Sequence, residues 1–199
     1  MSKVLYVAEV GSAHKGTPSL AFELIRQSAQ AGADVIKFQF GWTRAAQAAA
    51  HHVPYMAVRY VDDFADQLAE WCDYFGVELM ASIWSKEGLE TARRVGMKRY
   101  KIAHQMQDLD LIRSILGDGK PIFWSNGDYR QVSGATKLLW SSMEYPTYDL
   151  SALPTLFYDT RGKPEIGYYG YSDHSHGIAP CLLAIARGAL YVEKHFCLD

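Results

Sequence analysis

The sequence has few cysteines, no long apolar run and no excess of one charge, and each absence excludes a class of protein. The three cysteines, Cys72, Cys181 and Cys197, are scattered and lack the CxxC spacing of a zinc site. They predict reduced thiols and no disulfide framework. No apolar run approaches the roughly 18 residues that cross a bilayer, and no signal-peptide apolar region opens the chain. We therefore expect a cytoplasmic protein with no membrane partner.

Charge is nearly balanced, with 20 Lys and Arg against 22 Asp and Glu and a formal net charge of -2. This balance favours neither nucleic acid nor an anionic membrane as a partner. A length of 199 residues, with 49% hydrophobic and 21% charged residues, is ordinary for one globular domain. We expect a single domain over residues 1–199, whose small, neutral or anionic substrate needs only local positive charge.

Short apolar strands alternate with segments of helical periodicity, the pattern of an α/β fold with a parallel sheet. Several strands are almost wholly apolar before a polar last residue, which predicts a closed TIM (β/α)8-type barrel with its chemistry at the C-terminal rim. The predicted strands are Leu5–Glu9, Val35–Gln39, Glu78–Ile83, Tyr100–Ala103, Ile122–Ser125, Lys137–Ser141, Ile166–Gly170 and Leu190–His195. The predicted helices are Pro18–Ala31, Asp62–Phe75, Lys86–Val95, Leu109–Leu116 and Ile178–Arg187.

The predicted barrel is a reduced one. Only Asn126–Thr136 separate the fifth and sixth strands, and a crossover with a full helix normally takes a dozen residues or more. The sequence stops at Asp199, which leaves no eighth helix over the seam between the last strand and the first. We expect apolar barrel surface to be exposed at both places, and hence a homo-oligomer or a separate lid subunit.

Two histidines, His174 and His195, stand where the predicted last two strands end. The C-terminal ends of parallel barrel strands meet at one rim, so both side chains are expected to face the same space. An imidazole pair with water suits a borderline divalent cation. The pair therefore predicts a metal site, and Asp173 either orients an imidazole or forms a turn.

Lys37 and Lys101 lie within otherwise apolar predicted strands, where burial of a lysine is costly unless an opposite charge faces it. An anionic substrate would supply that charge. The alternative is a structural pairing with a carboxylate such as Glu9, which ends the first strand and is as suited to bind Lys37 as to move protons. Three strand-end hydroxyls offer the short donors that a phosphate or carboxylate needs, namely Ser82, Ser125 and Ser172.

In their order along nearly the whole chain, these motifs resemble the sialic acid synthase family. This family comprises the phosphoenolpyruvate-dependent N-acetylneuraminate synthases and their legionaminate and pseudaminate relatives. The motifs that carry the resemblance are Ala8-Glu9-Val10-Gly11, His14-Lys15-Gly16, Lys37-Phe38-Gln39, Tyr100-Lys101-Ile102, Tyr145-Pro146-Thr147, Gly167 to Ser175 and Glu193-Lys194-His195-Phe196.

The resemblance implies an enzyme that condenses phosphoenolpyruvate with an N-acetylated amino-sugar aldehyde to give a nonulosonic, sialic-type acid. It implies a divalent ion, Mn²⁺ or Mg²⁺, on His174 and His195, which match the family's metal ligands. Glu9 and Lys37 are the expected catalytic residues. The positions that match substrate contacts are Gln39, Ser82, Lys101, Ser125, Tyr145 and Ser172.

The chain also departs from the family pattern. His104-Gln105-Met106 replaces a phosphate-side serine and a sugar-side acid, and Met143 stands where an Asn contacts phosphoenolpyruvate. We expect no C-terminal antifreeze-like domain of the kind that the family carries. Three hypotheses stay open: an active synthase, a non-catalytic or altered-substrate paralogue that binds metal or phosphosugar, and the barrel half of a split synthase that a separate lid subunit completes.

Overall fold

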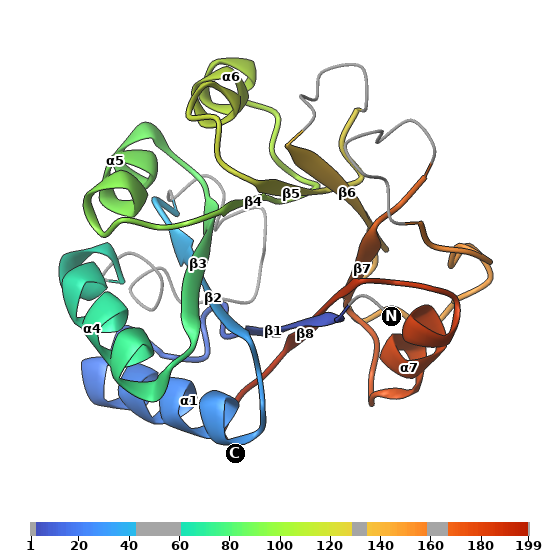
Figure 1. Ribbon diagram of the computed structural model, residues 1–199, viewed down its shortest axis with the longest axis horizontal. Coiled ribbons are helices and arrows are strands. Elements are labelled where there is room, and N and C mark those ends of the chain that lie inside the picture. Colours follow the sequence, from blue (N-terminus) through green and yellow to red (C-terminus); the bar gives the residue numbers. More distant parts are fainter. Residues whose placement is uncertain (1–2, 43–60, 129–134, 159–166, 199) are drawn as a thin grey trace.

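The structure, a computed structural model, describes residues 3–42, 61–128, 135–158 and 167–198. Eight parallel strands form a closed barrel in sequential order, with β8 paired to β1. Figure 1 shows the strands as a ring with the helices outside it. The predicted TIM-type barrel is therefore confirmed. No helix in these residues is long and apolar enough to cross a membrane.

The strands are β1 Leu5–Glu9, β2 Val35–Phe40, β3 Glu78–Ile83, β4 Tyr100–Ile102, β5 Ile122–Ser125, β6 Thr136–Ser141, β7 Gly170–Asp173 and β8 Tyr191–His195. The helices are α1 Pro18–Gln30, the 3-10 turn η1 Asp62–Phe64, α4 Ala65–Phe75, α5 Lys86–Arg94, α6 Leu109–Gly117 and α7 Ala179–Ala186. Most elements begin and end within two residues of their predicted bounds.

The predicted bounds of the seventh strand are wrong. The sequence predicts Ile166–Gly170, whereas β7 spans Gly170–Asp173. Ser172 and Asp173 are typical of loops, but here both are buried with partners: Ser172 donates to Glu193, and Asp173 accepts from Tyr171 and Lys194. A buried strand tolerates polar residues when their hydrogen bonds are satisfied.

Capping residues set where two of the outer helices begin. The Ser85 side chain accepts a hydrogen bond from Gly88 at the start of α5, and the Asp108 side chain accepts from two backbone amides at the start of α6. α4 ends at Gly76, whose φ of 69° is the left-handed conformation that glycine adopts without strain. These helices therefore start and stop at sites that their sequence favours.

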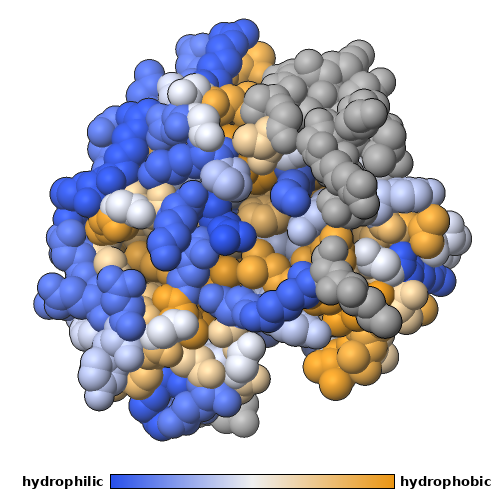
Figure 2. Space-filling model, in the orientation of Figure 1, coloured by the Kyte–Doolittle hydropathy of each residue, from blue (hydrophilic) through white to orange (hydrophobic). Residues whose placement is uncertain are grey.

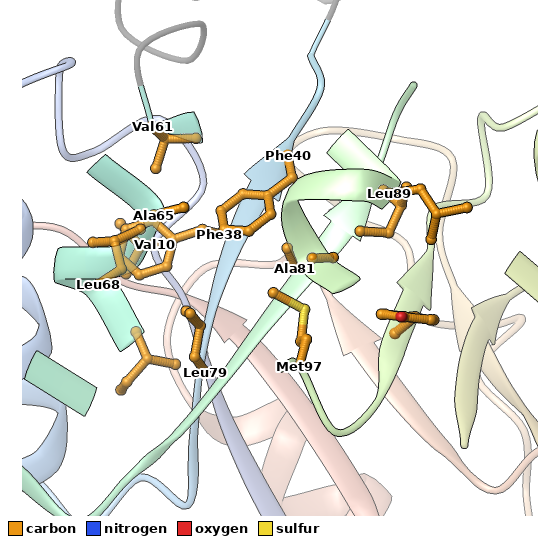
Figure 3. Close-up of a cluster of buried hydrophobic side chains, with 14 of the residues drawn as sticks. Val10, Phe38, Phe40, Val61, Ala65, Leu68, Leu79, Ala81, Leu89 and Met97 are labelled. Atoms are coloured by element: carbon orange, nitrogen blue, oxygen red, sulfur yellow. The ribbon is translucent and has the colours of Figure 1, made fainter. Parts of the chain in front are cut away.

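Alternate side chains of each strand point to opposite faces, and this places the polar residues of the barrel. On β2, Phe38 and Phe40 point outward and are fully buried against the helices, in the apolar layer that Figure 3 shows between β2, β3 and the outer helices. Lys37 and Gln39 consequently face the interior. Below them, an apolar plug fills the barrel, made of Val7, Val35, Met80, Phe123, Leu139 and Tyr191.

Polar residues stand two positions beyond each member of this plug. Glu9 follows Val7, Lys37 follows Val35, and Glu193 follows Tyr191. In the same way Ser82, Ser125 and Ser141 follow Met80, Phe123 and Leu139. Because the strand period is two, these six side chains form one polar layer on top of the plug, at the C-terminal end of the barrel.

The connection between β5 and β6 has no helix in its described residues, 126–128 and 135, and residues 196–198 after β8 are not helical either. The described part of the connection from β6 to β7 also has no helix, and the sequence predicted none there.

The prediction of exposed apolar surface at the fifth crossover is wrong. The outward side chains Ile122, Trp124 and Leu138 are all buried there, with Gly127 packed on the Trp124 ring. At the seam of β8 and β1, Tyr6 is 43% exposed. Helix α7 presents more apolar surface, from Ile178, Leu182 and Leu183, which accounts for the hydrophobic area at the lower right of Figure 2.

Candidate active site

One cavity of about 560 Å³ opens at the C-terminal end of the barrel. It is lined by all ten candidate residues, Glu9, Lys37, Gln39, Ser82, Lys101, Ser125, Tyr145, Ser172, His174 and His195. Eight of them lie on seven of the eight strands, and the other two, Tyr145 and His174, follow β6 and β7. The barrel topology thus brings together side chains that lie up to 186 positions apart, from Glu9 to His195.

Lys37 lies at the floor of the cavity among carboxylates. Its ammonium group forms an ion pair with Glu9, lies 3.5 Å from a carboxylate oxygen of Glu193 and donates to the Ser82 hydroxyl over 2.8 Å. Burial alone would lower the pKa of Lys37, but the two carboxylates raise it. The structural pairing that the sequence left open therefore exists, and Lys37 is charged without a ligand.

The two carboxylates differ in the state that their surroundings favour. Burial raises the pKa of Glu9, despite the ion pair with Lys37. Burial would raise the pKa of Glu193 too, but the charges of Lys37 and Lys101 and hydrogen bonds from Tyr191 and Ser172 lower it. Glu193 is thus the permanent anion of the floor, and Glu9 is the carboxyl group able to hold or release a proton.

Lys101 is the second buried cation of the floor, at 3% exposure. It donates to the Ser125 hydroxyl over 2.8 Å and forms no ion pair with the residues that the structure describes. Burial lowers the pKa of Lys101 to about 8. The carboxylates of Glu193 and Glu9 act on this ammonium group only from a distance, which leaves it able to bind an anion directly.

The two histidines converge at the rim, with ring centres 5.7 Å apart. His174 Nδ1 lies 3.2 Å from the Ser142 carbonyl oxygen, which only accepts, so Nδ1 carries the proton and Nε2 has a free lone pair. Burial is the main cause that lowers the pKa of both histidines. Both rings are therefore neutral near pH 7, the form that binds metals.

This donor set fits a divalent ion. A ring centre lies about 3.2 Å from an ion that its nitrogen binds, so the two rings are close enough to share one ion. The described residues contain no group of three or more His, Cys, Asp or Glu side chains that could hold a metal. Two imidazoles would thus leave the other coordination positions to water and substrate, as catalytic sites require.

Asp173 does not orient either imidazole. It accepts hydrogen bonds from the Tyr171 hydroxyl, the Cys181 thiol, the Lys194 ammonium group and the Ser175 amide. Since Lys194 precedes His195 and Ser175 follows His174, these bonds tie together the two segments that carry the histidines. The turn-forming alternative, through the Ser175 amide, is the one that the structure contains.

The departures from the family pattern fall only partly in the cavity. His104, Gln105 and Met143 line it. Met106 does not; it is 9% exposed and packs in the outer apolar layer, because the chain turns at Ala103, whose carbonyl accepts from the Met106 amide. Its place in the chain therefore says little about the acceptor pocket.

Sequence reasoning missed several cavity residues, of which Glu193, Trp42 and Trp84 matter most to the chemistry. Glu193 shares a face of β8 with His195, so the alternation along that strand was a signal that could have found it. Trp42 and Trp84 also line the cavity, but they follow their strands in loops. No periodicity reveals the direction of such side chains.

The fold and the site together define an α/β-barrel protein with a charged cavity at the C-terminal end of its strands. Residues 24–199 match the NeuB family. The chain therefore belongs to the NeuB family.

Relatives of this family share low identity over almost the whole chain. An N,N'-diacetyllegionaminic acid synthase of Campylobacter jejuni is 28% identical over 100% of the chain and 69% of its own length. The enzyme of the same name from Legionella pneumophila is 26% identical over 97% of the chain and 64% of its own length. The chain thus spans about two thirds of these relatives.

A solved structure agrees with the fold. The N-acetylneuraminic acid (sialic acid) synthetase of Leptospira borgpetersenii superposes with a TM-score of 0.79 at 25% identity, over 99% of this chain and 74% of that one. A truncated 3-deoxy-D-arabino-heptulosonate 7-phosphate synthase of Thermotoga maritima, with a TM-score of 0.63 at 13% identity, shares the fold alone. The chain is thus related to sialic-type acid synthases, and the roles of its own residues stay predictions.

Proposed function

We propose that this protein condenses phosphoenolpyruvate with an N-acetylated amino-sugar aldehyde to give a nonulosonic acid, with a divalent metal, Mn²⁺ or Mg²⁺, on His174 and His195. One observation carries the proposal: a single cavity combines a buried, unpaired lysine at its floor with a neutral histidine pair at its rim. The lysine suits the anionic phosphoenolpyruvate, and the histidine pair suits a metal ion beside an uncharged sugar.

The floor would hold the phosphate and carboxylate of phosphoenolpyruvate. Lys101 supplies a charge that forms no ion pair with the described residues, and the hydroxyls of Ser82 and Ser125, which accept from the two lysines, can donate to the ligand. Ser172 would donate to the ligand in place of Glu193, to which its hydroxyl donates here. Lys37 stays ion-paired and would lend part of its charge while it holds Glu9 in place. These residues bind and orient the donor before any bond forms.

The reaction forms a carbon–carbon bond from the enol carbon of phosphoenolpyruvate to the aldehyde carbon, adds water at the adjacent carbon and releases phosphate. A bound divalent ion would supply Lewis-acid polarisation of the aldehyde oxygen. Glu9, whose raised pKa lets it hold a proton, gives that proton to the aldehyde oxygen as the bond forms. Gln39 donates to Glu9 over 3.3 Å and helps to fix the position of the carboxyl group.

A change of acceptor is the second candidate function, and the rim favours it. Among the described residues that line the cavity, the only carboxylates are Glu9 and Glu193, both at the floor. An acceptor that needs an acid at the rim would find none there. We also propose that a second copy of the chain or a separate lid subunit covers the cavity, which is open to solvent at His195.

A phosphate-release assay with phosphoenolpyruvate, Mn²⁺ and a panel of N-acetylated amino sugars tests the proposal. We expect release that depends on the sugar, stops with a chelator and is lost in Glu9→Gln. If both ligands bind but no sugar releases phosphate, the protein is a non-catalytic paralogue. If release begins only when an antifreeze-like domain is added, the split synthase is correct.

A further inference from the structure

The charged and uncharged residues of the cavity are separated by depth. Its four charged side chains, Glu9, Lys37, Lys101 and Glu193, all belong to strands and form the floor. The residues that line it beyond the strands carry no formal charge while the histidines are neutral, and include Trp42, Trp84, His104, Gln105 and Tyr145. A charged ligand group therefore binds deep, and an uncharged one binds at the rim.

Two tryptophans form one side of this rim. Trp42 follows β2 and Trp84 follows β3, and their rings meet edge to face with centres 4.2 Å apart. The chain is held tightly at this point, because a Cβ on Gly41 would overlap the Ser85 hydroxyl and Gly41 itself has a φ of 69°. The Gly41 amide also donates to Asp62 over 3.0 Å. The pair is thus a built surface at a fixed place.

Both indole N–H groups lack a partner. Trp42 is 8% exposed, and neither Trp42 Nε1 nor Trp84 Nε1 has a hydrogen-bond acceptor among the described residues. A buried donor left unpaired costs about 1–3 kcal/mol, so pure packing is a poor explanation for two of them side by side. A ligand that carries acceptors would satisfy them after a small shift of the rings.

The position of the two tryptophans relative to the two histidines defines the path that a ligand in contact with both must take. Trp42 and Trp84 follow β2 and β3, the histidines lie at the ends of β7 and β8, and β1 with Glu9 stands between the two groups in the ring of strands. A molecule that touches both groups therefore crosses above Glu9. Aromatic rings with N–H donors, on a rim where no carboxylate is among the described lining residues, suit an uncharged sugar, whose C–H face packs on a ring and whose oxygens accept hydrogen bonds.

We infer that Trp42 and Trp84 form the acceptor-binding wall of the cavity, where an indole N–H donates to the acyl oxygen of an N-acylated, uncharged sugar. This inference rests on the proposed function, because it assigns the place of the acceptor in that reaction. An acetamido oxygen accepts from an indole N–H, and an amine, which has no acyl oxygen, cannot form this hydrogen bond.

Trp84 provides the sharper test because it is only half-buried. With Mn²⁺ present, calorimetry would measure the binding of N-acetylmannosamine, of mannosamine and of phosphoenolpyruvate to wild type, Trp84→Phe and Trp84→Ala. We expect Trp84→Phe, which keeps a ring but loses the N–H, to weaken N-acetylmannosamine binding about 3- to 10-fold. Trp84→Ala should weaken it further. Phosphoenolpyruvate affinity should stay within about twofold, and mannosamine, which has no acyl oxygen, should lose less affinity than N-acetylmannosamine does in Trp84→Phe.

Trp71→Phe is the matched control. Trp71 lies on α4, where its ring packs on Phe22 with centres 5.4 Å apart, and it does not line the cavity. It should bind all three ligands as wild type does. Sugar binding that is unchanged in both Trp84 variants, an equal loss of sugar and phosphoenolpyruvate in Trp84→Phe, or no sugar binding by wild type would overturn the inference.

The two proposals fail in different ways. Phosphate release with a KM for the sugar that does not depend on Trp84 would leave the proposed reaction in place and refute the tryptophan wall. Sugar binding that depends on Trp84, without phosphate release under any condition, would support the wall and refute the reaction.

Discussion

Lys101 donates a hydrogen bond to Ser125 over 2.8 Å and forms no ion pair with the described residues, whereas Lys37 is paired with Glu9. The two buried lysines therefore differ in their ion pairing, although both lie on barrel strands, Lys37 on β2 and Lys101 on β4. Removal of Lys37 leaves the carboxylates of Glu9 and Glu193 without the cation that pairs with both. Removal of Lys101 takes away the charge that is available to a ligand, and it is the cleaner probe of anion binding.

Lys101→Met should bind phosphoenolpyruvate at least about tenfold more weakly than wild type, because a hydrogen bond to a charged group contributes about 1.5–3 kcal/mol. Methionine keeps most of the volume of the buried stem, so the fold should persist. Isothermal titration calorimetry measures the change. Lys98→Met, at an exposed position outside the cavity, is the control and should bind as wild type does. Equal affinities for Lys101→Met and wild type would show that Lys101 is structural.

Phosphoenolpyruvate affinity should fall at alkaline pH. Burial lowers the pKa of Lys101 to about 8, so the free protein loses this charge as the pH rises through about 8. A bound anion favours the charged form, and each pH unit above about 8 should weaken binding by up to about tenfold. Dissociation constants between pH 7 and pH 9.5 test this. Lys101→Arg keeps its charge at these pH values and should show no comparable decrease; a decrease of the same size in both proteins would implicate another group.

The predicted metal site requires His174 but not the nearby His176. His174→Ala should weaken Mn²⁺ binding at least about tenfold, since one of two protein ligands is lost. His176→Ala removes an exposed imidazole two residues away that does not line the main cavity, and should leave Mn²⁺ binding unchanged. Electron paramagnetic resonance of free Mn²⁺ gives both affinities. The same loss in both variants would point to a disturbed loop, and no loss in His174→Ala would refute the ligand role.

His14 makes the fold sensitive to acid. Burial lowers the pKa of His14 from its ordinary 6.5 to about 4. Below about pH 6.5 the unfolded chain therefore binds a proton that the folded chain does not take up until about pH 4. The free energy of unfolding should fall over this interval by up to about 3 kcal/mol, as chemical denaturation at each pH would measure.

His14→Asn tests the assignment. The Asn side-chain oxygen can accept the Gly16 amide hydrogen bond that His14 Nδ1 accepts over 2.9 Å, without a group that titrates. We expect a shallower loss of stability in acid, with the remainder due to the other buried histidines. A slope as steep as that of wild type would assign the effect elsewhere.

Periodicity predicted the barrel well because most strands are apolar on both faces. β1, β3 and β5 have the predicted bounds. β7 was misplaced because its buried residues are polar and are satisfied by partners on β8, which no local pattern reveals. A sequence pattern reports which side chains avoid water, and it is silent about polar side chains that find their partners in another strand.

The sequence likewise predicted some features of the candidate site and not others. Strand-end residues were predicted into one cavity because the topology alone brings them to one rim. The state of each group was not predictable, because it depends on distances: Glu9 and Glu193 are both strand carboxylates, yet their pKa values are shifted in opposite directions. Trp42 and Trp84 were missed because the direction of a loop side chain depends on close packing, here at Gly41.

The pairing of β1 with β8 makes the order of synthesis matter. Glu9 on β1 and Lys37 on β2 leave the ribosome early, but Glu193 and the strand that closes the ring are made about 150 residues later. Until then β1 has an unpaired edge, and the polar layer lies open to water. For most of its synthesis the nascent chain thus exposes an unpaired strand edge that can pair with other chains. Cellular yield should therefore depend on chaperones that shield this edge, more than on the stability of the finished barrel.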